Sequence, residues 1–250
     1  MGAQDDFDWN WANSTGGKLD RRQVGKLLVA AATLIPGAFS SHALTFLGKQ
    51  GPGALDDVEM RIPDTTLAKE AEWEARNKLS PWVLEHSYRV YYFGKVLAKI
   101  DRVPIDEELH FVTAILHDIE FEHPVPGRCF AVRGAQDAEN FLTGLNVSRD
   151  KVVLVRNGIS GHITFGVEKD LTDLAGIVSA GCETDLAGTR IEEMNRPWVD
   201  TVVAQHPRLD FKRRVIEAVR IESENVPEGR TAVMRGLGFD MGVTTAPFAE

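Results

Sequence analysis

Phe111-Val-Thr-Ala-Ile-Leu-His117-Asp118 is the stretch of this sequence that decides the fold. An apolar helix that ends on a histidine and an aspartate offers an imidazole nitrogen and a carboxylate to the same cation. Burying both groups costs free energy unless a partner compensates them. The helices on either side are therefore expected to supply further ligands that face inward.

Helical patterns flank this stretch on both sides. Residues 66–79 have the caps and apolar spacing of one helix, and Pro81 suits the first turn of the next, with Ser80 as its N-cap. That second helix carries an apolar stripe at i, i+3, i+4 and i+7 as far as Ile100. Further helical patterns open at Asp106 and run over 134–142, 148–159, 171–186, 197–205 and 210–223. No segment has a convincing strand alternation, so the sequence predicts an all-α fold.

Two further metal-ligand types lie on apolar faces of these helices. His86 follows Val83 at helical spacing, and Asp185 follows Val178 and Cys182 in the same way. A single histidine on an apolar face is more often a core residue with a satisfied hydrogen bond. Two imidazoles and two carboxylates pointed at one core are better explained by a divalent transition metal, which compensates all four together.

This order of residues resembles the HD-domain superfamily of metal-dependent hydrolases, whose signature is a histidine, an adjacent His-Asp pair and a distal aspartate on a helical bundle. The surrounding sequence is most similar to the cyanamide hydratase-like branch of that superfamily. The segments that carry the resemblance are 79–94, 106–109, 114–118, 130–138 and 206–212. The resemblance covers roughly residues 62–224, and it implies an HD-domain helical bundle with a mononuclear metal site in its core.

The resemblance also implies a role for each of these residues. His86, His117, Asp118 and Asp185 would bind one divalent metal ion, with zinc or iron favoured. Asp118 and His162 are the catalytic candidates, His162 as a pocket residue or proton shuttle. Further candidates for the pocket are Arg89, Glu120, Glu122, His123, Thr164 and Cys182.

The segment 119–124 departs from many members of that superfamily, which have glycine or small polar residues there. Three interpretations of its two glutamates and its histidine are open: they reshape the pocket, they bind a second ion, or they belong to a solvated loop. We favour the solvated loop. For Arg89, a structural salt bridge is a more common role than contact with an anionic substrate. For Cys182 a buried inert thiol is commoner than a pocket residue.

The resemblance implies that a metal-activated water is added to a small molecule, in particular to a cyanamide-like or nitrile-like C≡N group. The first alternative is hydrolysis of a nucleotide or phosphoester, which usually requires arginine or lysine around the metal. No basic cluster and no glycine-rich phosphate loop accompanies the four ligands. A di-iron HD oxygenase and a non-catalytic HD binding module rank lower still.

Composition limits the partners. The net charge of −9 argues against broad nucleic-acid binding, because phosphate contacts require clustered lysine and arginine. The 2 cysteines are too few for a disulfide framework. We therefore expect a small-molecule substrate, with a homo-oligomer plausible.

The two ends of the chain are expected to lie outside the HD domain, which we place at 61–225. Residues 1–60 comprise a polar tail and an apolar segment, and residues 226–250 form a C-terminal tail. Arg21-Arg22 before the apolar run resembles a twin-arginine export signal over 21–43, which would make the protein periplasmic or exported. The alternative is a docking helix in a cytoplasmic protein. Pro36 and Gly37 interrupt the run, which argues against a stable membrane span.

Overall fold

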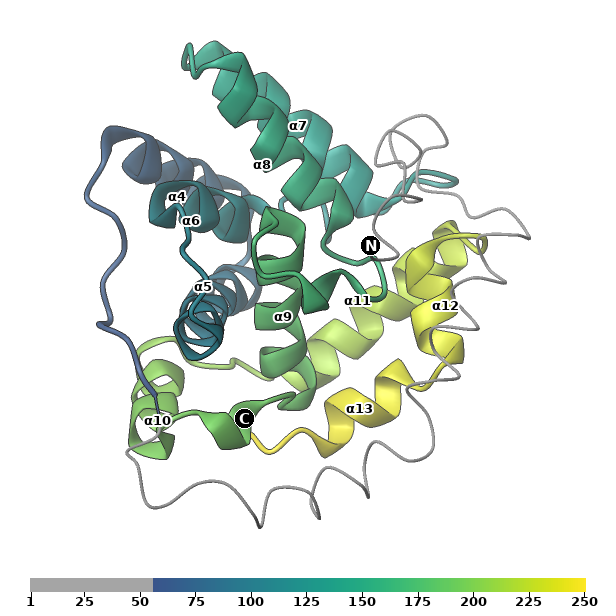
Figure 1. Ribbon diagram of the computed structural model, residues 1–250. Coiled ribbons are helices and arrows are strands. Elements are labelled where there is room, and N and C mark those ends of the chain that lie inside the picture. The colour runs from purple at the N-terminus through teal and green to yellow at the C-terminus, as the bar shows by residue number, and fades with distance from the viewer. Residues whose placement is uncertain (1–55) are drawn as a thin grey trace, which may run out of the picture.

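The computed structural model describes residues 56–250, so the expected export signal at 21–43 lies outside the described residues. Within that range the fold is built from ten α-helices, joined by turns and two short 3₁₀ segments, with no strand. The prediction of an all-α fold is confirmed for the described part of the chain (Figure 1). The first five helices are α4 Thr66–Lys78, α5 Pro81–Asp101, α6 Glu107–Leu116, α7 Phe130–Gly144 and α8 Arg149–Gly161. The others are α9 Leu174–Ala187, α10 Arg196–Gln205, α11 Phe211–Asn225, α12 Arg230–Gly236 and α13 Phe239–Thr245.

The helix boundaries follow from short capping signals. The Thr65 side chain accepts a hydrogen bond from Ala68 N at the start of α4, and Asp106 accepts one from Leu109 N at the start of α6. The expected Pro81 occupies the first turn of α5, which ends where Arg102 takes a left-handed conformation with φ 57°. These local signals are why the predicted helices agree with the observed ones to within a few residues.

The centre of the molecule is the contact between α5 and α9, which lie side by side in Figure 1. Two glycines make this close approach possible. A Cβ atom at Gly94 of α5 would lie 2.8 Å from the Ile177 carbonyl oxygen, and one at Gly181 of α9 would press into the Val90 carbonyl. Small residues at both positions therefore bring the His86 helix against the helix that carries Cys182 and Asp185.

Residues 226–250 differ from the expected tail, because most of them fold into α12 and α13. These two helices pack against α11, and α13 also packs against α9, so the C-terminal segment closes one side of the core (Figure 1). Within this segment Arg230 is 1% exposed and Thr231 is 2% exposed, so the start of α12 is buried. Among the described helices, none combines the length and the apolar character that crossing a membrane requires.

Candidate metal centre

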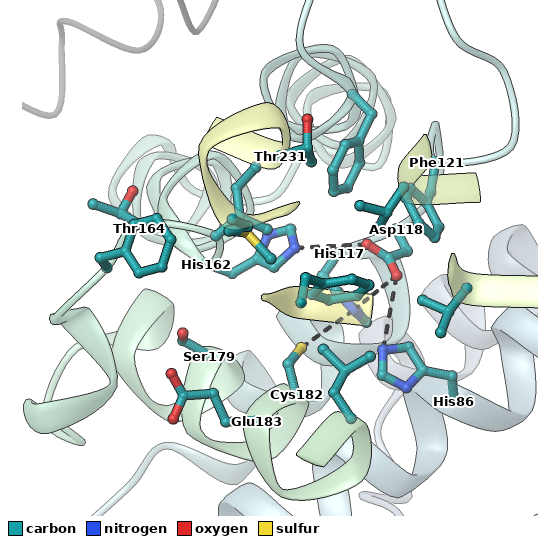
Figure 2. A pocket seen from close by; sticks show the side chains of 18 residues that line it. His86, His117, Asp118, Phe121, His162, Thr164, Ser179, Cys182, Glu183 and Thr231 are labelled. Atoms are coloured by element: carbon teal, nitrogen blue, oxygen red, sulfur yellow. Dashed lines mark hydrogen bonds and ion pairs between the residues drawn. The ribbon is translucent and has the colours of Figure 1, made fainter. Parts of the chain in front are cut away.

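Five residues with metal-binding side chains face one another where four helices meet (Figure 2). His86 lies on α5 and Cys182 on α9, whereas His117 and Asp118 directly follow α6 and His162 directly follows α8. None of the five exposes more than 7% of its surface. The structure thus brings together His86, His117, Asp118 and His162, as the sequence predicted, and adds the thiol of Cys182 to them.

The three histidines share one hydrogen-bonding pattern. His86 Nδ1 lies 2.7 Å from Asp185 Oδ2, His117 Nδ1 lies 2.7 Å from the Ala114 carbonyl oxygen, and His162 Nδ1 lies 2.7 Å from the Ile159 carbonyl oxygen. An oxygen acceptor at Nδ1 fixes the proton there and leaves the Nε2 lone pair free. Each imidazole is therefore held with Nε2 turned toward the centre of the cluster, as a metal ligand is.

The facing atoms of the five residues lie 3.2 to 3.8 Å apart in the pairs that are in closest contact. Asp118 Oδ2 lies 3.2 Å from His117 Nε2 and 3.8 Å from His86 Nε2. Asp118 Oδ1 lies 3.6 Å from His162 Nε2, and Cys182 Sγ lies 3.6 Å from His117 Nε2. Two ligands bound tetrahedrally at about 2.0–2.3 Å from zinc are themselves about 3.3–3.6 Å apart. The ligand atoms fall into two groups of three, His86–His117–Cys182 and His117–Asp118–His162, and each group could hold a metal ion.

Asp185 lies behind His86 and away from this cluster. Its carboxylate accepts hydrogen bonds from Arg89 Nε at 2.8 Å and Nη2 at 2.9 Å, from Arg208 Nη1 at 2.7 Å, and from His86 Nδ1. It belongs to neither of the two groups of ligand atoms that lie within 4.8 Å of one another, His86–His117–Cys182 and His117–Asp118–His162. The structure thus places Asp185 where it orients His86, and places Cys182, one turn earlier on α9, beside His86 and His117.

The positive charges around Asp185 explain how its carboxylate can be buried in the charged form. Burial alone would raise the pKa of the Asp185 carboxyl, but Arg89, His86 and Arg208 hold this pKa well below its usual range. Asp185 is therefore a permanent carboxylate whose lone pairs are already used by its cationic neighbours. The Arg89 guanidinium also donates to the carbonyl oxygens of His206 and Pro207, so Arg89 has the structural role that the sequence favoured.

A cavity of about 100 Å³ opens on the cluster. Its wall is mainly apolar and includes Phe121, Phe130 and Phe165, with Val215 and Val219 from α11. The polar groups beside the ligand residues are those of Thr164, Ser179, Glu183 and Thr231, several of which are labelled in Figure 2. No lysine or arginine is among the described residues that line this cavity.

Besides Asp118, Glu183 is the only carboxyl group among the described residues that line this cavity. Burial raises the pKa of Glu183 to about 8, and the nearby Glu168 carboxylate adds to the shift. Thr164 is 4% exposed, and its hydroxyl accepts a hydrogen bond from Arg230 Nη1 at 2.8 Å. Thr164 and Cys182, both named from the sequence, do line the cavity.

The side chains that follow Asp118 make structural contacts and do not form a second metal site. Glu120 forms an ion pair with Arg133, and Glu122 accepts hydrogen bonds from Trp82 Nε1 and Ser80 N. His123 is exposed, and none of the three lines the cavity. The two glutamates therefore hold the turn that positions Asp118, which is a structural role.

Sequence reasoning missed the cations and the C-terminal residues of the site. Arg208 is 2% exposed and binds Asp185, and Arg230 is 1% exposed and binds the Ser160 carbonyl oxygen and Thr164. Arg208 lies in the segment 206–212, which carries part of the HD-domain resemblance, but the resemblance gave Arg208 no role. For Arg230 the sequence offered no signal, because 226–250 has the composition of a tail.

No protein-family model matches the chain, and no curated protein matches it either.

Proposed function

We propose that this protein is a metalloenzyme that binds one divalent metal ion at the buried cluster around His117, the residue common to both groups of ligand atoms, and adds water to a small, uncharged substrate. The observation that carries the proposal is the convergence of three imidazole Nε2 atoms whose Nδ1 atoms are all engaged by oxygen acceptors. Core histidines that serve packing alone have no reason to share one orientation. Metal-ligating histidines nearly always have it.

The donor set fits a borderline transition metal. Imidazole and thiolate together favour zinc over magnesium or calcium, which prefer oxygen ligands. The pKa of the buried Cys182 thiol is lowered, because His117 and His86 outweigh the effect of burial. Zinc is thus the ion we propose, and iron is the alternative that the same imidazole and carboxylate ligands accept.

A bound divalent ion would supply a Lewis acid and lower the pKa of a coordinated water to about 7. His162 is the residue we assign to proton transfer, because its Nε2 faces Asp118 at 3.6 Å and its ring is fixed by the Ile159 carbonyl oxygen. At that position it takes up a proton at Nε2 during attack and returns it to the substrate. The apolar wall around Phe121 and Phe130 excludes bulk water from the same space.

Hydration of a C≡N group, giving an amide or urea-type product, is the reaction we propose for this site. Two arguments support it: the resemblance to the cyanamide hydratase-like branch of the HD-domain superfamily, and the absence of lysine and arginine from the described residues that line the cavity. A phosphoester hydrolase would need cations to balance the charge of its substrate. The buried arginines near the site are already engaged: Arg89 and Arg208 pair with Asp185, and Arg230 donates to the Ser160 carbonyl oxygen and Thr164.

Elemental analysis of the full chain, combined with a hydration assay on cyanamide and small nitriles, tests the proposal. We expect about one zinc or iron per chain, and amide or urea product that disappears after chelation. His117→Ala should abolish both the metal content and the activity. The matched control His123→Ala, at an exposed position outside the cavity, should retain both. A metal-free chain after reconstitution, or full activity in His117→Ala, would refute the proposal.

A further inference from the structure

A second pocket, of about 280 Å³, is lined by residues of α7, of α8 and of the segment just before α7. Three of the residues that line it are arginines, Arg128, Arg133 and Arg156. The other lining residues are Cys129, Val132, Gln136 and Glu139. The pocket shares no residue with the metal cavity, and its lining is basic where that of the metal cavity has no cation.

Two of these arginines have guanidinium donors to spare. Arg128 is exposed, and within residues 56–250 its side chain makes no hydrogen bond or ion pair. Arg156 makes only long contacts, at 3.3 and 3.4 Å to the Asn157 side chain and 3.5 Å to Glu139. A guanidinium has five N–H donors, so all five of Arg128 and two of the five of Arg156 remain available, and the three that Arg156 uses make long contacts.

The single carboxylate among the lining residues does not neutralise them. Glu139 Oε1 accepts a hydrogen bond from Arg149 Nη1, and only its other oxygen lies near Arg156. Arg133 is different, because it pairs with Glu120 and donates to the His123 carbonyl oxygen. The pocket therefore keeps an excess of positive charge on Arg128 and Arg156, and Gln136 adds an amide group beside them.

We propose that this pocket is a binding site for a small oxyanion, with Arg128 and Arg156 as its principal ligands. Planar guanidinium groups form paired, charge-assisted hydrogen bonds with the oxygens of a phosphate or carboxylate group. The electrostatic attraction is stronger in a concave site than on a flat surface, where solvent screens the arginine side chains. The proposal does not depend on the metal centre, because no group that it uses touches the metal ligands.

Isothermal titration of the full, metal-loaded chain with inorganic phosphate, at an ionic strength held constant with chloride, tests the proposal. We expect one binding event per chain that weakens about tenfold in Arg128→Gln and about tenfold in Arg156→Gln, since a charged hydrogen bond contributes about 1.5 kcal/mol or more. Arg133 is left intact, because it holds the turn after Asp118. The control Arg196→Gln removes an equal charge from α10, where Arg196 pairs with Asp200.

The outcomes separate this site from the metal centre. Phosphate that binds at the metal would be lost in His117→Ala and unaffected by Arg128→Gln, and that result would overturn the proposal. Equal weakening in Arg196→Gln would overturn it too, since the binding would then reflect net charge alone. Absence of phosphate binding to the unmodified chain, at concentrations up to about 10 mM, would do the same, because two arginines in a pocket should reach millimolar affinity.

Discussion

Asp185→Asn is the substitution that best separates the two roles available to this carboxylate. In the structure Asp185 neutralises Arg89 and Arg208, whose side chains are both 0% exposed. Asparagine keeps the volume of the side chain but removes the charge, and it turns one acceptor oxygen into an NH₂ donor that faces guanidinium donors. Arg89 is then left without a carboxylate partner, and Arg208 keeps only its ion pair with Glu250.

Breaking a buried ion pair by removing one partner costs about 3–5 kcal/mol. For a chain of this size each kilocalorie per mole lowers the melting temperature by about 2–4 °C, so we expect a decrease of about 6–20 °C. The matched control is Asp200→Asn on α10, where the carboxylate side chain is 62% exposed and pairs with Arg196. That change should alter the free energy of unfolding by less than about 0.5 kcal/mol.

The assay is urea unfolding followed by tryptophan fluorescence, carried out with EDTA and again with zinc. A carboxylate that serves as a counter-ion destabilises the metal-free protein when it is replaced. A carboxylate that serves as a metal ligand costs little without metal, because its replacement then removes repulsion from Asp118. A loss below about 1 kcal/mol in EDTA, together with loss of bound zinc, would refute our assignment of Asp185 and restore the ligand role that the sequence implies.

Three further outcomes follow from individual contacts. In the cobalt-substituted protein, Cys182→Ser should remove a near-ultraviolet sulfur-to-cobalt charge-transfer band; an unchanged spectrum would exclude the thiolate from the coordination sphere. Gly181→Ala presses a methyl group into the Val90 carbonyl and should cost about 1–3 kcal/mol in urea unfolding, whereas Gly236→Ala, with open space around it, should not destabilise the protein. Burial lowers the pKa of His110 from its usual 6.5 to about 3, so protons bind the unfolded chain first, and stability should fall as pH decreases from 6.5 toward 3. His110→Leu should flatten that decrease by up to about 1.4 kcal/mol per pH unit, and an unchanged pH profile of the unfolding free energy would contradict the assignment.

The helices could be predicted because their signals are local. Pro81 at the start of α5, Asp106 as the cap of α6 and the apolar stripe of α5 each lie within a few residues of the structure that they determine. The C-terminal helices α12 and α13 could not, because each has only seven residues. A helix this short is not stable alone, and α12 and α13 are stabilised by packing against α9 and α11. Such packing cannot be predicted from the local sequence pattern.

The same distinction applies to the candidate metal centre. His86, His117 and Asp118 could be named from the sequence because they lie on or at the end of apolar helix faces, and buried polar groups need compensation. His162 was named only through the resemblance to the HD-domain superfamily. Which atoms form hydrogen bonds with these groups depends in part on residues far away in the sequence. The Nδ1 acceptors of His117 and His162 are carbonyl oxygens one turn earlier, whereas that of His86 belongs to a residue on another helix.

Cys182 and Asp185 show where helical periodicity stops being informative. Residues three apart on an α-helix differ by about 60° around its axis, so both positions count as facing the core. The choice between them depends on which side of α9 the cations occupy. Arg89 reaches Asp185 from α5, and Arg208 reaches it from the segment between α10 and α11. A carboxylate surrounded by two guanidinium groups is held away from the cluster, and this leaves the softer ligand, the thiol of Cys182, to face the imidazoles.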